Sequence, residues 1–158
     1  MADDDPLIIR DGRQSETAAA VARGAGRLLR QANYVPISEF VLPTGQRVDL
    51  MALDAAGSVL IVEVKSSVAD FRADQKWSGY LDFCDLMYFA IPPEVPQDLI
   101  PAGTGLILAD AWGAAFLRHP QRVALSAARR KAITLQFARA AAQRLHAIHD
   151  PNAHLMAP

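Results

Sequence analysis

Residues 47–65 read RVDLMALDAAGSVLIVEVK, and this stretch decides the fold. Two short apolar runs flank a turn at 54–58, and the second run is rich in β-branched residues. Such a pattern predicts a β-hairpin, with Gly57 at the position of the turn that favours a positive φ. In this register Leu53 pairs with Val59, and Asp49 lies opposite Glu63 across the two strands.

The hairpin brings two carboxylates, Asp49 and Glu63, opposite each other between strands that we expect to be buried. Like charges in this position repel each other, and buried charges need partners. A Mg²⁺ ion between them, with the Val64 carbonyl as a third ligand, would remove the conflict. Lys65 shares the face of Glu63. The set predicts metal-dependent phosphodiester hydrolysis, in which Lys65 holds or helps to deprotonate the attacking water, or stabilises the developing negative charge.

A structural interpretation of the same residues stays open. A Glu-x-Lys sequence on a strand often forms an ion pair on a solvated sheet surface. The run at 59–62 is apolar on both faces, which argues against a solvated surface. The alternative to a metal site is therefore a buried salt bridge between Lys65 and Asp49 or Glu63.

Length and composition set the frame for this site. The chain has 158 residues, of which 51% are hydrophobic, enough for one domain with a sizeable core. We expect a flexible segment at 1–13, a single nuclease-like domain at 14–150 and a tail at 151–158. The single cysteine, Cys84, excludes an internal disulfide and a cysteine-rich metal site. No segment is long and apolar enough for a membrane span or a secretion signal, which predicts a cytoplasmic protein without a membrane partner.

The remaining elements follow from periodicity, caps and turns. Ser15 and Ser67 are each expected to cap a helix, with Asp70 at the third helical position after Ser67. Pro36 within the first strand indicates an edge position. We expect helices at 15–32, 67–81 and 123–149, and strands at 34–42, 47–53, 59–65, 86–91, 105–109 and 114–117. This order predicts an α/β fold with a mixed β-sheet flanked by helices.

Basic side chains in the last third of the chain are candidates for contacts with DNA. No Asp or Glu occurs from 111 to 149, where seven Arg and Lys residues lie. The cluster Arg129, Arg130 and Lys131 would add sequence-independent affinity for phosphates, and a solvated helix face is the alternative interpretation. On the first helix, Arg23 and Arg27 share a face that would follow a DNA backbone.

The pattern of Asp49, Glu63 and Lys65 on consecutive strands resembles that of the PD-(D/E)XK nuclease superfamily. Val48 stands in place of the proline that gives the superfamily its name. A longer pattern resembles the MmcB-like DNA-repair proteins of bacteria. It comprises 47–49, 62–67, 70–71, 74–77, Tyr80, 84–85, 105–107, Asp110 and 129–132. The resemblance implies a restriction-endonuclease-like fold and a role in the repair of damaged DNA.

The resemblance also adds candidate residues outside the hairpin. Some superfamily nucleases carry a Gln and Tyr pair after the lysine strand, and Lys76 and Tyr80 have that spacing here. We expect both on an exposed face that contacts DNA, with core packing as the alternative for Tyr80. Some relatives place a glutamate of the first helix near the metal, so Glu16 is a further candidate ligand, although it also suits the helix N-terminus.

The leading hypothesis is a DNA-repair deoxyribonuclease that depends on Mg²⁺, or on Mn²⁺ in its place, and acts on damaged or branched DNA. The second is a catalytically silent DNA-binding or scaffold module on the same fold. A third is a metal-free structural protein in which these charges only pair with one another.

Overall fold

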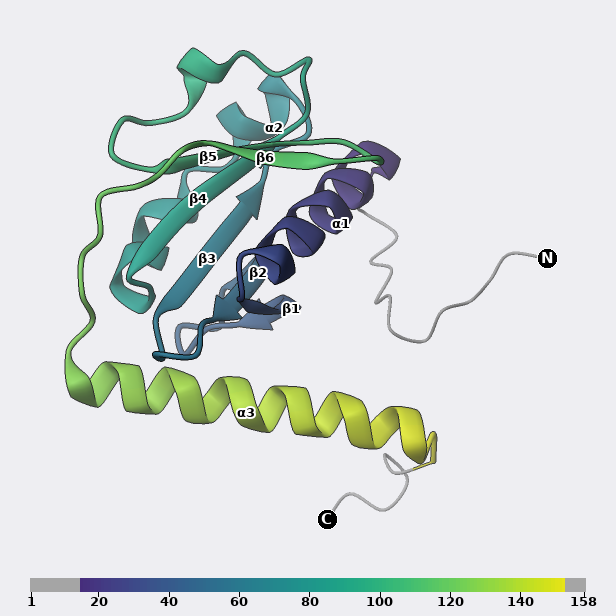
Figure 1. Ribbon diagram of the computed structural model, residues 1–158, viewed down its shortest axis with the longest axis vertical. Coiled ribbons are helices and arrows are strands. Elements are labelled where there is room, and N and C mark those ends of the chain that lie inside the picture. The colour runs from purple at the N-terminus through teal and green to yellow at the C-terminus, as the bar shows by residue number, and fades with distance from the viewer. Residues whose placement is uncertain (1–14, 153–158) are drawn as a thin grey trace.

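The computed structural model describes residues 15–152 as one six-stranded mixed sheet with helices on both faces (Figure 1). The strands follow one another across the sheet in chain order. They are β1 (Val35–Val41), β2 (Arg47–Leu53), β3 (Val59–Val64), β4 (Leu86–Ile91), β5 (Gly105–Ala109) and β6 (Ala114–Arg118). β3, β4 and β5 are parallel and the other pairings are antiparallel. The predicted α/β fold is confirmed; the predicted segment 1–13 and residues 153–158 of the predicted tail lie outside the described residues.

The β2–β3 hairpin has the predicted register, because Leu53 pairs with Val59. Asp54 holds the turn, since its Oδ1 accepts the N–H groups of Ala56 at 2.9 Å and Ser58 at 2.7 Å. Gly57 has a φ of +82°, which glycine adopts at no steric cost. All six residues of β3 are buried, as a strand between two covered sheet faces requires.

Helix α1 (Glu16–Gln31) covers one face of the sheet (Figure 1). It begins where predicted, because the Ser15 hydroxyl accepts the N–H of Ala18. Its buried stripe of Val21, Ala25 and Leu29 packs on side chains from the central strands. Burial of this stripe fixes α1 across the strands, so that its N-terminus lies near the end of β3.

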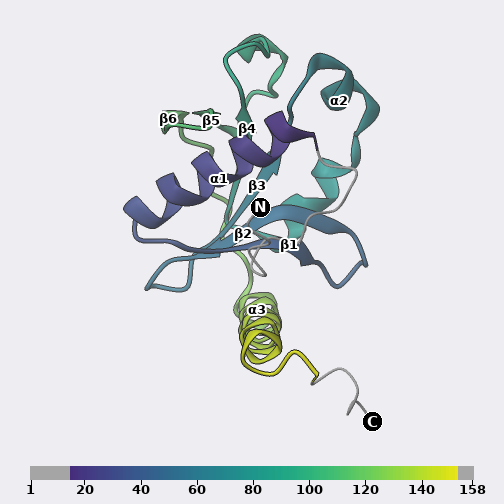
Figure 2. The same cartoon turned by 90° about the vertical axis from the view of Figure 1, so that its right-hand side faces the viewer.

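The other face is covered by shorter elements and by the last helix. These are α2 (Val68–Ala73), η1 (Lys76–Phe83), η2 (Gln97–Leu99) and α3 (Ala127–His149). Phe89 of β4 contacts this layer, because Phe71 and Trp77 pack edge-on against its ring. Figure 2 shows α3 end-on, with β1 and β2 between it and α1. No helix in the described part of the chain is long and apolar enough to cross a membrane.

Two predicted helices have different boundaries in the structure. The helix predicted at 67–81 breaks at Asp74, whose backbone is extended because its carboxylate binds Lys65 and the Lys76 N–H. The last helix begins at Ala127 and not at Val123. Residues before it are extended, since the N–H groups of Val123 and Leu125 are donated to the carbonyl and the carboxylate of Asp85.

Candidate active site

A cavity of about 400 Å³ opens at the end of β3, where β1, β2, α1 and α2 meet. The described residues that line it are Ser15, Ala18, Glu39, Arg47, Asp49, Glu63, Val64, Lys65, Ser66, Asp70 and Asp74. The structure thus brings Asp49, Glu63, Val64 and Lys65 together, as the hairpin register predicts.

Asp49 and Glu63 form a pair of carboxylates, of which Glu63 is buried and Asp49 is half-buried. Asp49 Oδ2 accepts the N–H of Val64 at 2.7 Å, so this side chain reaches across to β3. Glu63 Oε2 is buried and has no hydrogen-bond partner within residues 15–152. Burial, followed by the charge of Asp49, raises the pKa of Glu63 to about 8. Burial also raises the pKa of Asp49. Both shifts show that two negative charges are costly here without a cation.

Lys65 is the cation nearest to this pair, and it is only 2% exposed. Its Nζ lies 2.9 Å from Asp74 Oδ2 and 3.5 Å from Glu63 Oε1. Burial opposes the charge of Lys65, but the hydrogen bond with Asp74 and the charge of Glu63 outweigh it and raise its pKa. Lys65 is therefore an ammonium at neutral pH. The alternative to a metal site, a salt bridge between Lys65 and Glu63, is therefore present. It leaves Glu63 Oε2 without a partner among the described residues.

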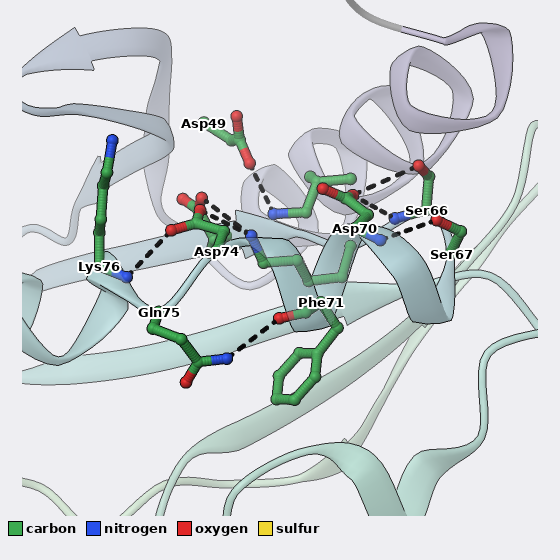
Figure 3. A network of polar contacts seen from close by, with 11 residues as sticks. Asp49, Ser66, Ser67, Asp70, Phe71, Asp74, Gln75 and Lys76 are labelled. Atoms are coloured by element: carbon green, nitrogen blue, oxygen red, sulfur yellow. Dashed lines mark hydrogen bonds and ion pairs between the residues drawn. The ribbon is translucent and has the colours of Figure 1, made fainter.

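The start of α2 forms one wall of the cavity and is fixed by a local network (Figure 3). Ser67 Oγ accepts the N–H of Asp70 at 3.0 Å, which confirms the predicted cap. The Asp70 carboxylate in turn accepts the N–H of Ser66 at 3.0 Å, one residue before the N-cap. In Figure 3 Asp74 points into the network, while the Lys76 side chain points away from it.

Glu39 of β1 also lines the cavity, and its backbone is distorted. Its φ is +49°, a conformation that is strained for a non-glycine residue. The ladder pairs Ser38 with Leu50 and Phe40 with Val48 but skips Glu39, which lies opposite Asp49. Arg144 of α3 donates to the carbonyls of Ser38 and Glu39 and so holds the distorted backbone. The sequence does not predict the distorted backbone of Glu39, because the distortion depends on a helix about 100 residues later.

The donor set fits a hard divalent cation that keeps part of its water shell. Among residues 15–152, no three His, Cys, Asp or Glu side chains converge as a complete set of metal ligands. Mg²⁺ does not need such a set, because proteins commonly hold it by one or two carboxylates, substrate phosphates and waters. The unpaired Glu63 Oε2 is an oxygen donor of this kind.

Three other predicted site residues lie in different surroundings. Glu16 is exposed in the first turn of α1, and Ser15 and Ala18 line the cavity in its place. Tyr80 does not share an exposed face with Lys76, because it is only 3% exposed, and that prediction is wrong. Burial and then the charges of Glu63, Asp74 and Asp49 raise the pKa of Tyr80, which places it against the inner side of the carboxylates. Lys76 is exposed.

Two arginines of the basic cluster at the start of α3 form contacts inside the protein, and the predicted contact of this cluster with phosphates stays a prediction. Arg130 donates to both oxygens of Asp85 at 2.6 and 2.7 Å, and to the Gly57 carbonyl at 2.8 Å. Arg129 donates to the carbonyl of Asp82 and lies over the Phe83 ring. Arg129 and Lys131 remain exposed cations.

The arginines predicted on α1 are placed as expected for contacts outside the protein. Arg23 and Arg27 are both exposed, on the side of α1 opposite its buried stripe. Arg27 donates one hydrogen bond to the Ala111 carbonyl at 2.9 Å and keeps its other donors.

Comparisons with known proteins identify the family of the chain and agree with its fold. A family model described as DNA repair protein MmcB-like matches residues 4–152. The chain belongs to the MmcB-like family of DNA repair proteins. This confirms the resemblance seen in the sequence, and it gives the chain a role in DNA repair.

Two solved structures are similar to the chain. One is a protein of unknown function from Silicibacter pomeroyi, 43% identical over 88% of this chain and 95% of that one, with a TM-score of 0.83. The other is a repair endonuclease from Pyrococcus abyssi, 18% identical over 57% of this chain and 42% of that one. Its TM-score of 0.35 is too low to support an argument. No curated protein matches the chain.

Proposed function

We propose that this MmcB-like chain hydrolyses phosphodiester bonds of DNA during repair, using a divalent cation held by Asp49, Glu63 and the Val64 carbonyl. The observation that carries the proposal is the buried Glu63 Oε2, which lies in a pair of carboxylates and has no partner among the described residues. A buried carboxylate oxygen left unpaired costs stability unless a ligand pairs with it. The membership in a DNA repair family indicates DNA as the substrate.

The charge of the cavity supports a requirement for a cation. Five carboxylates line it, against two cationic side chains, Arg47 and Lys65. A DNA phosphate is an anion and would be repelled by this lining. Mg²⁺, or Mn²⁺ in its place, would reverse the local charge. When bound, such an ion polarises the scissile phosphate and lowers the pKa of a coordinated water.

Lys65 stabilises negative charge in the proposed reaction and orients the attacking water. Its pKa is raised, so at neutral pH it has no free lone pair to take a proton from water. We therefore do not propose that Lys65 deprotonates the attacking water, which was one of the roles predicted from the sequence. Asp74 positions the ammonium through the 2.9 Å hydrogen bond. An ammonium fixed beside the phosphate stabilises the charge that develops in the transition state.

The test is cleavage of single-stranded, duplex, flapped and gapped DNA with Mg²⁺ or Mn²⁺, with EDTA as the metal-free reaction. We expect cleavage by the wild type only with the metal, and a loss of at least about 100-fold for Asp49→Asn and Lys65→Ala. Asp98→Asn is the matched control, because Asp98 is an exposed acid on η2 that does not line the cavity.

Two results would overturn the proposal. One is cleavage by the wild type in EDTA, or cleavage by the Lys65→Ala variant at the rate of the wild type. The other is the absence of cleavage on every substrate while binding to DNA is retained. That second result would make the chain a DNA-binding module on a nuclease-like fold.

A further inference from the structure

The turn between β5 and β6 presents a fully solvated tryptophan. Trp112 is 93% exposed, whereas the other tryptophan, Trp77, packs against Phe89. Most large aromatic side chains bury their rings, so a ring left in water on a folded domain is informative.

The backbone that carries Trp112 is rigid. Asp110 Oδ1 accepts the N–H groups of both Trp112 and Gly113 at 2.8 Å. The Asp110 N–H also donates to the Gly113 carbonyl at 2.9 Å. Gly24 of α1 packs directly under this turn, since a Cβ there would lie 2.7 Å from the Asp110 carbonyl oxygen. The backbone under the exposed ring is thus held by hydrogen bonds and by its packing on α1.

A hollow of about 430 Å³ lies beside the ring. Its lining includes Pro93, Leu108, Ala114 and Ala115 together with Trp112 itself. A flat apolar group would lie against the indole there with one face on Trp112. A nucleobase has this shape, and stacking on an aromatic side chain is tolerant of base identity.

Positive charge stands next to the turn that carries Trp112. Arg27 donates to the Ala111 carbonyl within the turn, and it has further donors for a phosphate. Arg23 and Arg30 are exposed one turn away along the same face of α1. The Asp110 carboxylate is the acid of the turn, and two backbone N–H groups occupy one of its oxygens. An aromatic ring beside several arginines matches single-stranded nucleic acid better than an apolar protein partner.

Trp112 also lies at the same edge of the sheet as the proposed catalytic cavity. β3, which ends at Val64, and β5, which ends at Ala109, run parallel with only β4 between them. Their carboxyl ends are therefore about 10 Å apart across the sheet. One DNA strand of a few nucleotides is long enough to reach both places.

We propose that Trp112 and the hollow beside it bind an unpaired nucleobase of the DNA substrate, while Arg27 and Arg23 contact neighbouring phosphates. The proposal rests on the proposed function for the identity of the ligand and deepens it, because it names DNA with a single-stranded portion as the substrate class. Bases within a duplex cover each other's faces, so only an unpaired base can stack on the indole.

The first experiment measures binding of the full-length protein in EDTA, where no metal-dependent cleavage occurs. The probes are an oligothymidylate of about 20 nucleotides and a blunt duplex of about the same length. We expect Trp112→Ala to weaken binding to the single strand by about 5- to 150-fold, the range for loss of one stacked base. Trp112→Phe should restore most of that affinity, and duplex binding should change by less than about twofold. Leu135→Ala is the control, since Leu135 is a 59% exposed apolar residue on α3.

A second measurement uses the fluorescence of Trp112 itself. The chain has two tryptophans, so Trp77→Phe leaves Trp112 as the only one. Saturation with the oligothymidylate should quench its emission through stacking on a base. Emission that stays unchanged at saturation overturns the proposal.

The outcomes separate this proposal from the catalytic one. Unchanged single-strand affinity of Trp112→Ala, or an equal loss for single strand and duplex, overturns the stacking site even if Lys65-dependent cleavage is found. Binding that depends on Trp112 in a protein that cleaves nothing supports the stacking site and removes the catalytic proposal.

Discussion

Two buried acidic clusters lie at opposite ends of β3, and they differ in how completely their oxygens are paired. At the start of the strand, the two oxygens of Asp85 accept hydrogen bonds from the N–H groups of Val59 and Leu125 and from the guanidinium of Arg130. At the end of the strand, Glu63 lies with Asp49 beside the ammonium of Lys65. In the part of the chain that the structure describes, Glu63 Oε2 has no partner. We call these the Asp85 cluster and the Glu63 cluster.

The pKa values follow the pairing. In the Asp85 cluster, burial alone would raise the pKa of the carboxyl, but the bonds from Arg130 and from the two N–H groups lower it to about 2. In the Glu63 cluster, burial and the second carboxylate dominate and the pKa rises to about 8. Complete pairing stabilises the fold, whereas incomplete pairing is retained where a ligand completes the site. The difference in pairing indicates a structural role for the Asp85 cluster and supports the proposed cation-binding role of the Glu63 cluster.

The largest expected effect comes from breaking the Asp85 cluster. Arg130→Ala leaves the fully buried Asp85 side chain without its counter-charge and removes the contact that attaches α3 to the β2–β3 turn. We expect the free energy of unfolding to fall by about 3 kcal/mol, the lower end for a broken buried ion pair. Urea denaturation followed by circular dichroism measures this loss.

The neighbouring residue supplies the control for that change. Arg129 is 49% exposed and approaches the carboxylate of Asp82 only to 4.0 Å. Arg129→Ala should therefore cost less than about 1 kcal/mol. Equal losses for the two variants would contradict the structural role assigned to Arg130.

The second expected effect has the opposite sign. Glu63→Gln replaces a carboxylate that is poorly tolerated by a neutral amide of the same shape. In EDTA at about pH 8 we expect this variant to be more stable than the wild type by about 2 kcal/mol. In the wild type, Mg²⁺ should raise the midpoint of thermal unfolding, and in Glu63→Gln this rise should be reduced or lost.

The pH dependence of that difference follows from the raised pKa. Between pH 4.5 and about 8, the Glu63 carboxyl binds a proton in the folded state more readily than in the unfolded state. Its contribution to stability is thus complete below pH 4.5 and is lost as pH rises toward 8. Denaturation of the wild type and of Glu63→Gln at about pH 5 and about pH 8 measures this contribution. A stability difference that is the same at both pH values would contradict the raised pKa.

The Glu63 cluster was predictable from sequence because its geometry is local. The Gly57 turn fixes the register of two adjacent strands, and the alternation along a strand then places Lys65 on the face of Glu63. The Asp85 cluster depends on Arg130, 45 residues later, and on N–H groups from two other segments. A run of basic residues in sequence reveals its charge but not the distant carboxylate that pairs with it.

The prediction of one continuous helix after β3 was wrong for a related reason. Helix propensity extends through Asp74, but the carboxylate of this residue has a stronger partner in Lys65, and the chain leaves the helical conformation there. Tyr80 consequently lies on a 3₁₀ helix facing the core, and not one α-helical turn after Lys76 on an exposed face. Local helix propensity was overridden by the ion pair between Asp74 and Lys65.

The smallest expected effect concerns the strained backbone beside the Glu63 cluster. Glu39 has a φ of +49° and adds negative charge near Asp49. Glu39→Gly removes both the strain and the charge, whereas Glu39→Ala removes the charge and keeps the strain. We expect Glu39→Gly to be more stable than Glu39→Ala by about 1 kcal/mol, measured by urea denaturation in EDTA.

Asn33 provides the matched control for this comparison, because its φ of +65° lies in the exposed turn after α1, away from the acidic cavity. Asparagine tolerates this conformation better than glutamate, so Asn33→Gly should gain less than Glu39→Gly. Identical stability of Glu39→Gly and Glu39→Ala would mean that only the charge of Glu39 matters. A gain in stability confined to Glu39→Gly would show that the protein maintains backbone strain at the Glu63 cluster, where the two hydrogen bonds from Arg144 hold the strained residue. The fully paired Asp85 cluster needs no such strain.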